Sequence, residues 1–433
     1  MLARTGLGLY ALLLFGFIFA GRHDSANVYS RLGTTESLVE RGEFMLDGSL
    51  YAFTIDKVRV NGHFYSHQPP ATAVIGALAY FPLYECGLRL FPPFWIGADL
   101  LFFFVNGLAA LIAVICFYRC LALFGFTGGL QLLMTAVLGT CTLLLSYSVT
   151  YNSHGVAAAS LIAAFYCYLR AERGSTNYTV LSGFAFSLTG ALEHAALVYY
   201  ALFAVLVLSK RGFAAFIYFV LPGGLTMLPT LYYYRAVSGS IAPLATRPEF
   251  FKYPGSYWSA GKESLTGIHW NTPIFTIRYA FRCLFGSRGF LLYNPVLTLG
   301  LIGTVQTITR RGDRWLEGLA IGVASIIFVG YYIIASTNYS GQCYSIRWFI
   351  PIIPVLMVFA GPQFQKLTIG WRRYGLALLL LVSAFYAFAG AMNPWVLEGH
   401  GYATPFYNVA SFWGRIPYRD HFSLAGFPYS SGR

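Results

Sequence analysis

A histidine and an aspartate face each other across a predicted β-hairpin near the start of the chain. The stretch DKVRVNGHFYSH contains Asn61-Gly62, the dipeptide most typical of a two-residue type I′ turn. Such a turn fixes the register and places Asp56 directly opposite His67, with their Cβ atoms about 5 Å apart. An aspartate at this distance stabilises positive charge on the imidazole ring. The pair therefore suits chemistry with an anionic group, although a solvated pair on a loop would have the same spacing.

Two other carboxylates lie where apolar segments end. Asp24 precedes a predicted helix, so it is either the N-cap of that helix or a general base at the mouth of a membrane groove. Glu193 and His194 lie between two apolar segments, where a charged group is either functional or part of a turn in contact with water. The four-residue spacing of His63 and His67 on a hairpin is not that of a helical zinc pair, so we predict no metal or other cofactor.

Arg347 is the strongest candidate for binding an anion. It opens a predicted span in the motif CYSIRWFIPIIP. A guanidinium at this depth suits a phosphate group, which it binds through two parallel hydrogen bonds. No ionisable residue falls in the middle of a predicted span, Glu193 and His194 aside, and this disfavours a coupled transporter.

The composition shows what must position these groups. Of the 433 residues, 57% are hydrophobic and only 10% are charged, against roughly 25% in soluble domains. This composition is typical of a protein that spans the membrane several times. The net charge of +13 comes from basic residues scattered between apolar runs, so we predict no nucleic-acid partner.

The apolar runs predict eleven membrane-spanning helices. We place them at 3–20, 96–118, 130–148, 155–169, 178–193, 194–209, 213–233, 289–308, 317–335, 348–365 and 374–392. Segment 71–88 is also apolar, but counting it as a span would invert every later loop. Leaving it in the outer interface places the short basic loops, such as those of Arg119, Arg170 and Lys210, inside, as the positive-inside rule requires.

The long loops then lie outside and carry the chemistry. They are 21–95 and 234–288, with the tail 393–433 on the same side. A stripe from Val28 to Val39 lies opposite Arg31 and Glu36, which is typical of an amphipathic helix lying on the membrane. The double proline after the hairpin can open a second interfacial helix over 71–88.

Five segments of the outer loops, in their order and approximate spacing, resemble a bacterial family of GT-C membrane glycosyltransferases. They are SRLGTTESLVERG, TIDKV, GHFYSHQPP, LFGSRGFLLYNP and NYSGQCYSIRWFIPIIP. This family is similar to protein O-mannosyltransferases and lipid A aminoarabinose transferases, and the likeness covers most of residues 20–360. It implies a polyprenyl-phosphate-linked sugar donor, an acceptor reached from the outer side, and inverting transfer with an aspartate of the first outer loop as base.

Together, the residue patterns and the resemblance predict roles for nine residues. The predicted catalytic residues are Asp24, Asp56 and His67, and those predicted to bind the donor phosphate or other parts of the substrate are Arg31, Gln68, Glu193, His194, Arg288 and Arg347. Many relatives carry an acidic residue and a lysine where this chain has His67 and Gln68. A neutral amide does not replace a lysine charge. The alternative is therefore a non-catalytic lipid- or glycan-binding protein, a flippase, or a structural subunit of a membrane complex.

The resulting prediction is an all-α polytopic membrane protein with a small β-hairpin. A GT-C-like domain over 1–392 is followed by the outer tail 393–433. We expect it in the bacterial cytoplasmic (inner) membrane with its active face outward. Its partners would be membrane lipids, the lipid-linked donor, and an acceptor that the sequence does not identify.

Overall fold

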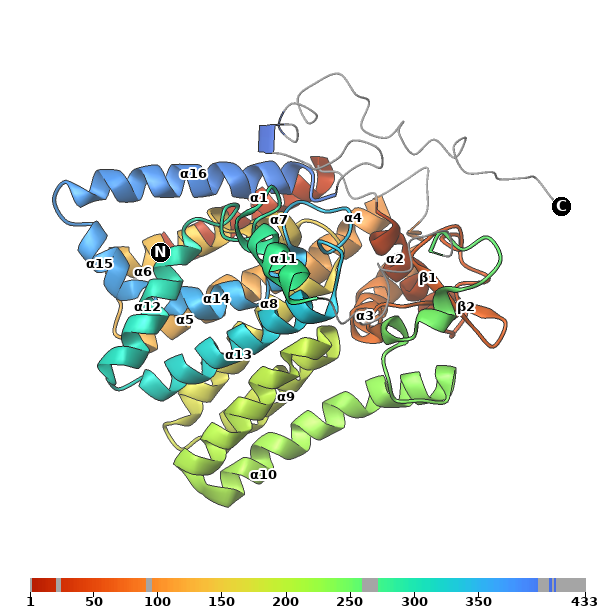
Figure 1. Ribbon diagram of the computed structural model, residues 1–433, viewed down its shortest axis with the longest axis horizontal. Helices are drawn as coiled ribbons and strands as arrows, with labels where there is room; N and C mark the ends of the chain where they lie inside the picture. Colours follow the sequence, from red (N-terminus) through yellow and green to blue (C-terminus); the bar gives the residue numbers. More distant parts are fainter. Residues whose placement is uncertain are drawn as a thin grey trace.

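The computed structural model describes residues 2–20, 25–90, 96–258, 272–395, 405–406 and 409. Most of these residues are helical, and the helices lie side by side with a small hairpin at one end (Figure 1). The longer helices are α1 (Leu2–Ala20), α2 (Ala26–Glu40), α3 (Pro70–Glu85), α5 (Leu108–Leu123), α6 (Gly128–Thr140), α8 (Ser153–Ala171), α9 (Thr176–Leu192), α10 (Leu197–Ser238), α11 (Pro273–Phe285), α12 (Leu297–Arg310), α13 (Trp315–Ala335) and α16 (Arg372–Met392). The shorter ones are α4 (Ile96–Phe102), η1 (Phe103–Gly107), α7 (Leu143–Ser148), η2 (His194–Ala196), η3 (Leu244–Thr246), η4 (Pro248–Phe251), η6 (Arg347–Phe349), α14 (Ile352–Val358) and α15 (Gly361–Leu367).

Five helical segments are long and apolar enough to cross a membrane, among the residues described. They are Ala3–Ala20, Ile96–Leu123, His194–Ser238, Trp315–Ala335 and Arg372–Met392. Several of the eleven predicted spans are not single helices: 130–148 divides into α6 and α7, and 348–365 into α14 and α15. The predicted spans 194–209 and 213–233 both lie in α10, which is kinked at Gly212, where φ is 80°. These long apolar helices make the chain an integral membrane protein.

Helix α8 lies at the centre of the bundle, and almost all of its residues are buried. It packs against α5, α9 and α14. The ring of Phe165 on α8 lies edge-on to Phe203 of α10, with 5.9 Å between the centroids. The side chain of Asn152 caps the start of α8 by accepting a hydrogen bond from the Gly155 amide at 3.0 Å. This cap fixes the first turn of α8, which carries Ser153 and His154.

The predicted hairpin is confirmed, with its predicted register. Strand β1 (Lys57–Val60) pairs antiparallel with β2 (His63–Ser66), so that Lys57 faces Ser66 and Val60 faces His63. Asn61 and Gly62 both have positive φ angles, 52° and 92°, as a type I′ turn requires. One position beyond the last pair of the ladder, His67 Nε2 lies 2.5 Å from Asp56 Oδ1.

Helix α2 is enclosed by protein, which contradicts the predicted helix with an exposed charged face. Residues 27–37 are all buried, and only 1% of Arg31 and 3% of Glu36 remain exposed. The neighbouring helix α3 packs closely against α2 beside Gly76, where a Cβ atom would overlap the Tyr151 hydroxyl. The charged side chains of α2 therefore point into the protein and form bonds there.

Several loops that were predicted to lie inside meet at the opposite end of the bundle from the hairpin. Arg314, before α13, forms an ion pair with Glu172, after α8, at 2.6 Å. Lys210, beside the kink of α10, forms an ion pair with the fully buried Glu317 of α13 at 2.5 Å. The two ends of the molecule therefore carry different sets of polar residues.

Candidate functional site

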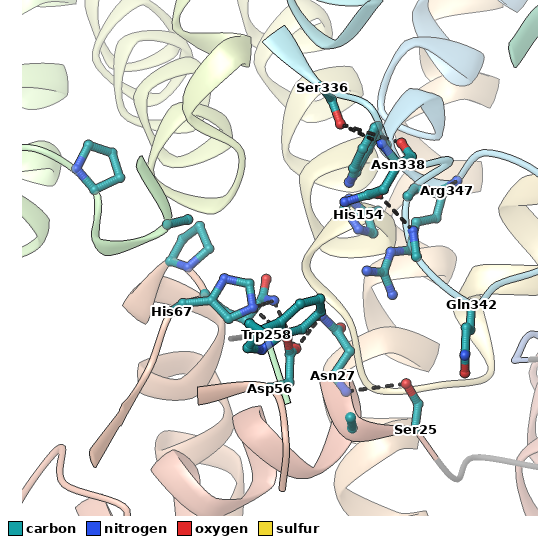
Figure 2. Close-up of a pocket in the computed structure, with 18 of the residues that line it drawn as sticks. Ser25, Asn27, Asp56, His67, His154, Trp258, Ser336, Asn338, Gln342 and Arg347 are labelled. Atoms are coloured by element: carbon teal, nitrogen blue, oxygen red, sulfur yellow. Dashed lines mark hydrogen bonds and ion pairs between the residues drawn. The ribbon is translucent and has the colours of Figure 1, made fainter. Parts of the chain in front are cut away.

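A cavity of about 420 Å³ lies between α2, the hairpin and the first turn of α8 (Figure 2). Its walls come from residues 25–27, 29, 53–56, 67–69 and 193–195, from His154, and from parts of 243–258 and 331–348. The structure thus brings together side chains that are far apart in the sequence. Aromatic rings cover much of the wall, and Tyr332 stacks on Trp348 with 4.7 Å between the ring centroids. An apolar cavity with a few convergent polar groups is the usual form of a small-molecule site.

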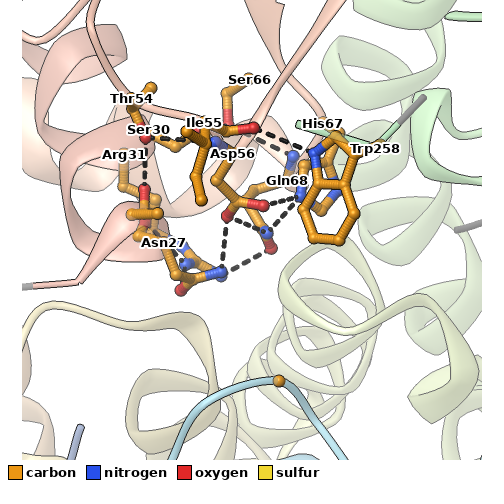
Figure 3. Close-up of polar contacts among 12 residues, drawn as sticks. Asn27, Ser30, Arg31, Thr54, Ile55, Asp56, Ser66, His67, Gln68 and Trp258 are labelled. Carbon is orange, nitrogen blue, oxygen red and sulfur yellow. Dashed lines mark hydrogen bonds and ion pairs between the residues drawn. The ribbon is translucent and has the colours of Figure 1, made fainter. Parts of the chain in front are cut away.

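Asp56 is the centre of the first polar cluster (Figure 3). In addition to His67 at 2.5 Å, its carboxylate accepts hydrogen bonds from Gln68 Nε2 and Asn27 Nδ2, both at 3.1 Å. The Trp258 indole donates to the Ile55 carbonyl at 2.9 Å and lies beside this cluster. Each carboxylate oxygen of Asp56 is therefore already engaged.

These contacts keep Asp56 ionised. Burial alone would raise the pKa of Asp56, but its interactions with His67, Arg347 and Arg31 outweigh burial and hold that pKa well below its usual range. Asp56 is consequently a carboxylate at neutral pH, and a weak proton acceptor.

Arg31 connects this cluster to a second one. Its Nη2 donates to Gln68 Oε1 at 2.9 Å and to Ser153 Oγ at 3.1 Å. Burial, together with repulsion from Arg347, lowers the pKa of Arg31 to about 10, so the guanidinium stays charged at neutral pH. Ser153 in turn donates to Glu193 Oε1 at 2.5 Å.

Glu193 is the centre of the second cluster. His154 Nδ1 lies 2.7 Å from Glu193 Oε1, and the Tyr332 hydroxyl donates to Oε2 at 3.0 Å. Glu193 directly follows α9, His154 lies in the first turn of α8 and Tyr332 lies on α13, so three helices converge on this carboxylate. The next residue, His194, lies near Tyr234, whose hydroxyl is 3.2 Å from His194 Nε2.

Arg347 faces the cavity with a guanidinium group that is only partly bonded. Its backbone N–H donates to Ser340 Oγ at 3.1 Å, and the guanidinium lies 5.0 Å from the centroid of the Trp395 ring. Its Nε atom is buried, and no residue that the structure describes accepts a hydrogen bond from it. No carboxylate of the described residues lies within ion-pair distance of Arg347 either. A half-buried cation in this state suits an anionic ligand.

Comparison with solved structures identifies the fold, although no family model and no curated protein matches the sequence. ArnT from Cupriavidus metallidurans in the apo state matches with a TM-score of 0.52 and 16% identity, over 90% of this chain and 70% of that one. ArnT bound to undecaprenyl phosphate gives a TM-score of 0.50 at 14% identity, over 89% and 71%. The apo Archaeoglobus fulgidus oligosaccharyltransferase gives 0.54 at 12% identity, over 95% and 59%. Both proteins belong to the GT-C superfamily. This chain has the GT-C fold.

The GT-C fold brings six of the nine predicted site residues to one cavity. They are Asp56, His67, Gln68, Glu193, His194 and Arg347. Arg31 lies behind this wall and bonds to Gln68. Asp24 lies outside the described residues, but its neighbour Ser25 lines the cavity.

Arg288 does not line this cavity, and its predicted role in binding the donor stays a prediction. It lines a separate pocket with Arg282 and Tyr339, and its Nη1 donates to the Gly341 carbonyl. The loop around residue 340 separates the two spaces, because Tyr339 lines one while Asn338 and Ser340 line the other.

Three residues that line the cavity and contact its carboxylates were not predicted. They are His154, Asn27 and Tyr332. The polar run YNSH directly before an apolar helix was the available indication for His154. Asn27 precedes Arg31 by one helical turn, but the sequence did not show that this face of α2 is buried.

Proposed function

We propose that this protein transfers a sugar from a polyprenyl-phosphate-linked donor to an acceptor at the outer face of the bacterial cytoplasmic membrane. The partly bonded guanidinium of Arg347 in a cavity of monosaccharide scale is the observation that carries this proposal. Support comes from the fold, because ArnT was solved with undecaprenyl phosphate and the archaeal oligosaccharyltransferase AglB with dolichol phosphate and a peptide. The sugar and the acceptor are not specified by these observations.

In the proposed reaction, the acceptor oxygen attacks the anomeric carbon as the bond from that carbon to the phosphate oxygen breaks. Arg347 stabilises the charge that develops on the departing lipid phosphate. The Asp56–His67 pair adds a second polar group next to it, and Gln68 and Arg31 hold this pair in place. The family resemblance implies that Asp24 is the general base, which accepts the proton of the acceptor.

A second candidate function is lipid or glycan binding without catalysis, or lipid flipping. It is favoured by Gln68, which stands where many relatives have a lysine and whose amide is fully used between Arg31 and Asp56. Sealed vesicles that separate transport of a polyprenyl-phosphate sugar from its consumption would distinguish the two functions.

The direct test is binding and turnover by Arg347 variants. Hydrogen bonds to charged groups contribute about 1.5–3 kcal/mol. Arg347→Ala should therefore weaken binding of undecaprenyl phosphate about 10–100-fold in detergent micelles. Arg347→Lys should retain part of the affinity, because it keeps the charge but not the paired hydrogen bonds. Arg373→Ala, at an exposed arginine that bonds to its neighbour Tyr374, is the matched control and should bind normally.

Turnover decides between enzyme and binding protein. Wild-type protein should consume at least one sugar in a panel of undecaprenyl-phosphate-linked hexoses and pentoses. Undiminished lipid binding by Arg347→Ala would contradict the proposed phosphate site, and binding without any consumption would favour the second function.

A further inference from the structure

The Glu193–His154 pair lies in the cavity but has no part in the reaction described above. Both side chains are almost completely buried, with 7% of Glu193 and 5% of His154 exposed. The Glu193 carboxylate accepts hydrogen bonds from the Ser153 hydroxyl at 2.5 Å and from the Tyr332 hydroxyl at 3.0 Å, in addition to its contact with His154 Nδ1. A carboxylate fixed from two sides orients the imidazole ring.

The ring has one nitrogen left for other chemistry. His154 Nδ1 lies 2.7 Å from Glu193 Oε1, although the two atoms are not aligned as in a regular hydrogen bond. The nearby carboxylate favours the N–H of a neutral imidazole on Nδ1, and Nε2 then carries a lone pair. No hydrogen bond joins His154 Nε2 to any residue in the described part of the chain, and His154 lines the cavity. Nε2 is therefore placed to accept a proton from a bound molecule.

The surroundings keep His154 neutral until a proton arrives. His154 lies in the first turn of α8, where the positive end of the helix dipole disfavours an imidazolium. Two guanidinium groups act in the same direction: Arg31 bonds to Ser153, and Arg347 lies on the same side of the cavity as His154 (Figure 2). Glu193 then stabilises the imidazolium once it forms, as the carboxylate does in a Ser-His-Asp triad.

The other groups of the cavity are less suited to take a proton. Asp56 is bonded to three donors, and its pKa is held well below the usual range. His194 Nε2 is already in contact with the Tyr234 hydroxyl at 3.2 Å. His67 uses Nε2 on Asp56 and Gln68, and its Nδ1 is buried.

We propose that His154, oriented by Glu193, is the general base that accepts the proton of the attacking acceptor. This inference rests on the proposed glycosyl transfer and moves the role from Asp24. In this step the acceptor O–H proton passes to His154 Nε2 while the acceptor oxygen bonds to the anomeric carbon. The carbon–oxygen bond to the lipid phosphate breaks with its electron pair on that oxygen, and the His154 imidazolium later releases its proton to water. Glu193 is a positioning residue and stays ionised throughout.

The test uses the full-length protein and the undecaprenyl-phosphate sugar that the wild type consumes. General base catalysis contributes about 10²–10⁴-fold, so His154→Ala should lose this factor in kcat while binding undecaprenyl phosphate normally. Added imidazole should restore part of the rate, a result that a purely structural role would not give. Glu193→Gln should lower kcat more than it changes KM, because it removes the charge that stabilises the imidazolium.

Two further variants complete the test. Asp24→Asn should keep more activity than His154→Ala. His63→Ala is the matched control, since His63 is an exposed hairpin histidine outside the cavity, and it should behave as wild type with or without imidazole. His154→Gln with wild-type turnover overturns the proposal, as does a His154→Ala protein that binds lipid but is not rescued by imidazole. A wild-type protein that consumes no donor would instead refute the proposed glycosyl transfer itself.

Discussion

Gln68 joins two buried charges of opposite sign. Its carbonyl oxygen accepts from Arg31 at 2.9 Å, and its amide nitrogen donates to Asp56 at 3.1 Å. A lysine has donors but no acceptor, so it cannot make both bonds. Arg31 places a positive charge directly against this amide.

This arrangement predicts that a lysine at position 68 does not improve the protein. Gln68→Lys would bring an ammonium group against the Arg31 guanidinium, and should lower both thermal stability and donor turnover. Gln68→Leu would remove one hydrogen-bond partner from Arg31 and one from Asp56. Each loss should lower the free energy of unfolding by about 1–3 kcal/mol. Gln365→Leu, at an exposed glutamine of α15, is the control and should change stability by less than about 0.5 kcal/mol. Thermal unfolding of the purified variants measures these effects, and a Gln68→Lys protein more stable and more active than wild type would contradict them.

At the residue scale, the sequence predicted what local geometry determines. Asn61-Gly62 fixes the hairpin register, and the register alone brings Asp56 to His67. The contact of Glu193 with His154 depends instead on how α8, α9 and α13 pack, and no short-range pattern encodes that packing. For the same reason, Arg288 could not be separated from the cavity before the loop around residue 340 was placed.

Among the elements, α2 and α3 determine the shape of the cavity. α2 carries Asn27 and Arg31. His67 and Gln68 lie just before the start of α3 at Pro70. Tyr151 joins them, because its hydroxyl lies 2.8 Å from Thr35 Oγ1 on α2 and donates to the Thr72 carbonyl on α3 at 2.9 Å. An amphipathic pattern shows that a helix has two faces, but not whether water or protein covers the polar one. This is why the enclosure of α2 was not predicted.

Gly76 is the tightest point of this packing. Because a Cβ there would overlap the Tyr151 hydroxyl, Gly76→Ala should displace that ring and destabilise the protein by about 1–3 kcal/mol. Gly375→Ala, in α16 where nothing lies near the added methyl group, should be neutral or slightly stabilising. Thermal unfolding checks both. Equal unfolding temperatures for the two variants would show that α2 and α3 are not packed in this way.

At the scale of the whole molecule, polar groups form two clusters, one at each end of the bundle. The cavity lies at the end with the hairpin, whereas Glu172, Lys210, Arg314 and Glu317 form ion pairs with one another at the other end. All four belong to loops, or to helix ends beside them, that the charge pattern assigned to the inner side. In the orientation that the charge pattern predicts, the cavity would face outward. The number of crossings remains a prediction, since α12 and the broken helices α6–α7 and α14–α15 are short of a full span.

Thiol labelling tests the eleven-span orientation, with the amino terminus inside and the carboxyl terminus outside. Cys86 follows α3 and is exposed, so in a variant without the other six cysteines an impermeant maleimide should label it in intact spheroplasts. Asp313→Cys, on an exposed turn of the opposite end in a protein lacking all native cysteines, should react only after permeabilisation. If segment 71–88 crossed the membrane, both results would be reversed, because Cys86 would move inside and every later loop would change sides. Labelling of position 313 in intact spheroplasts would therefore refute this topology.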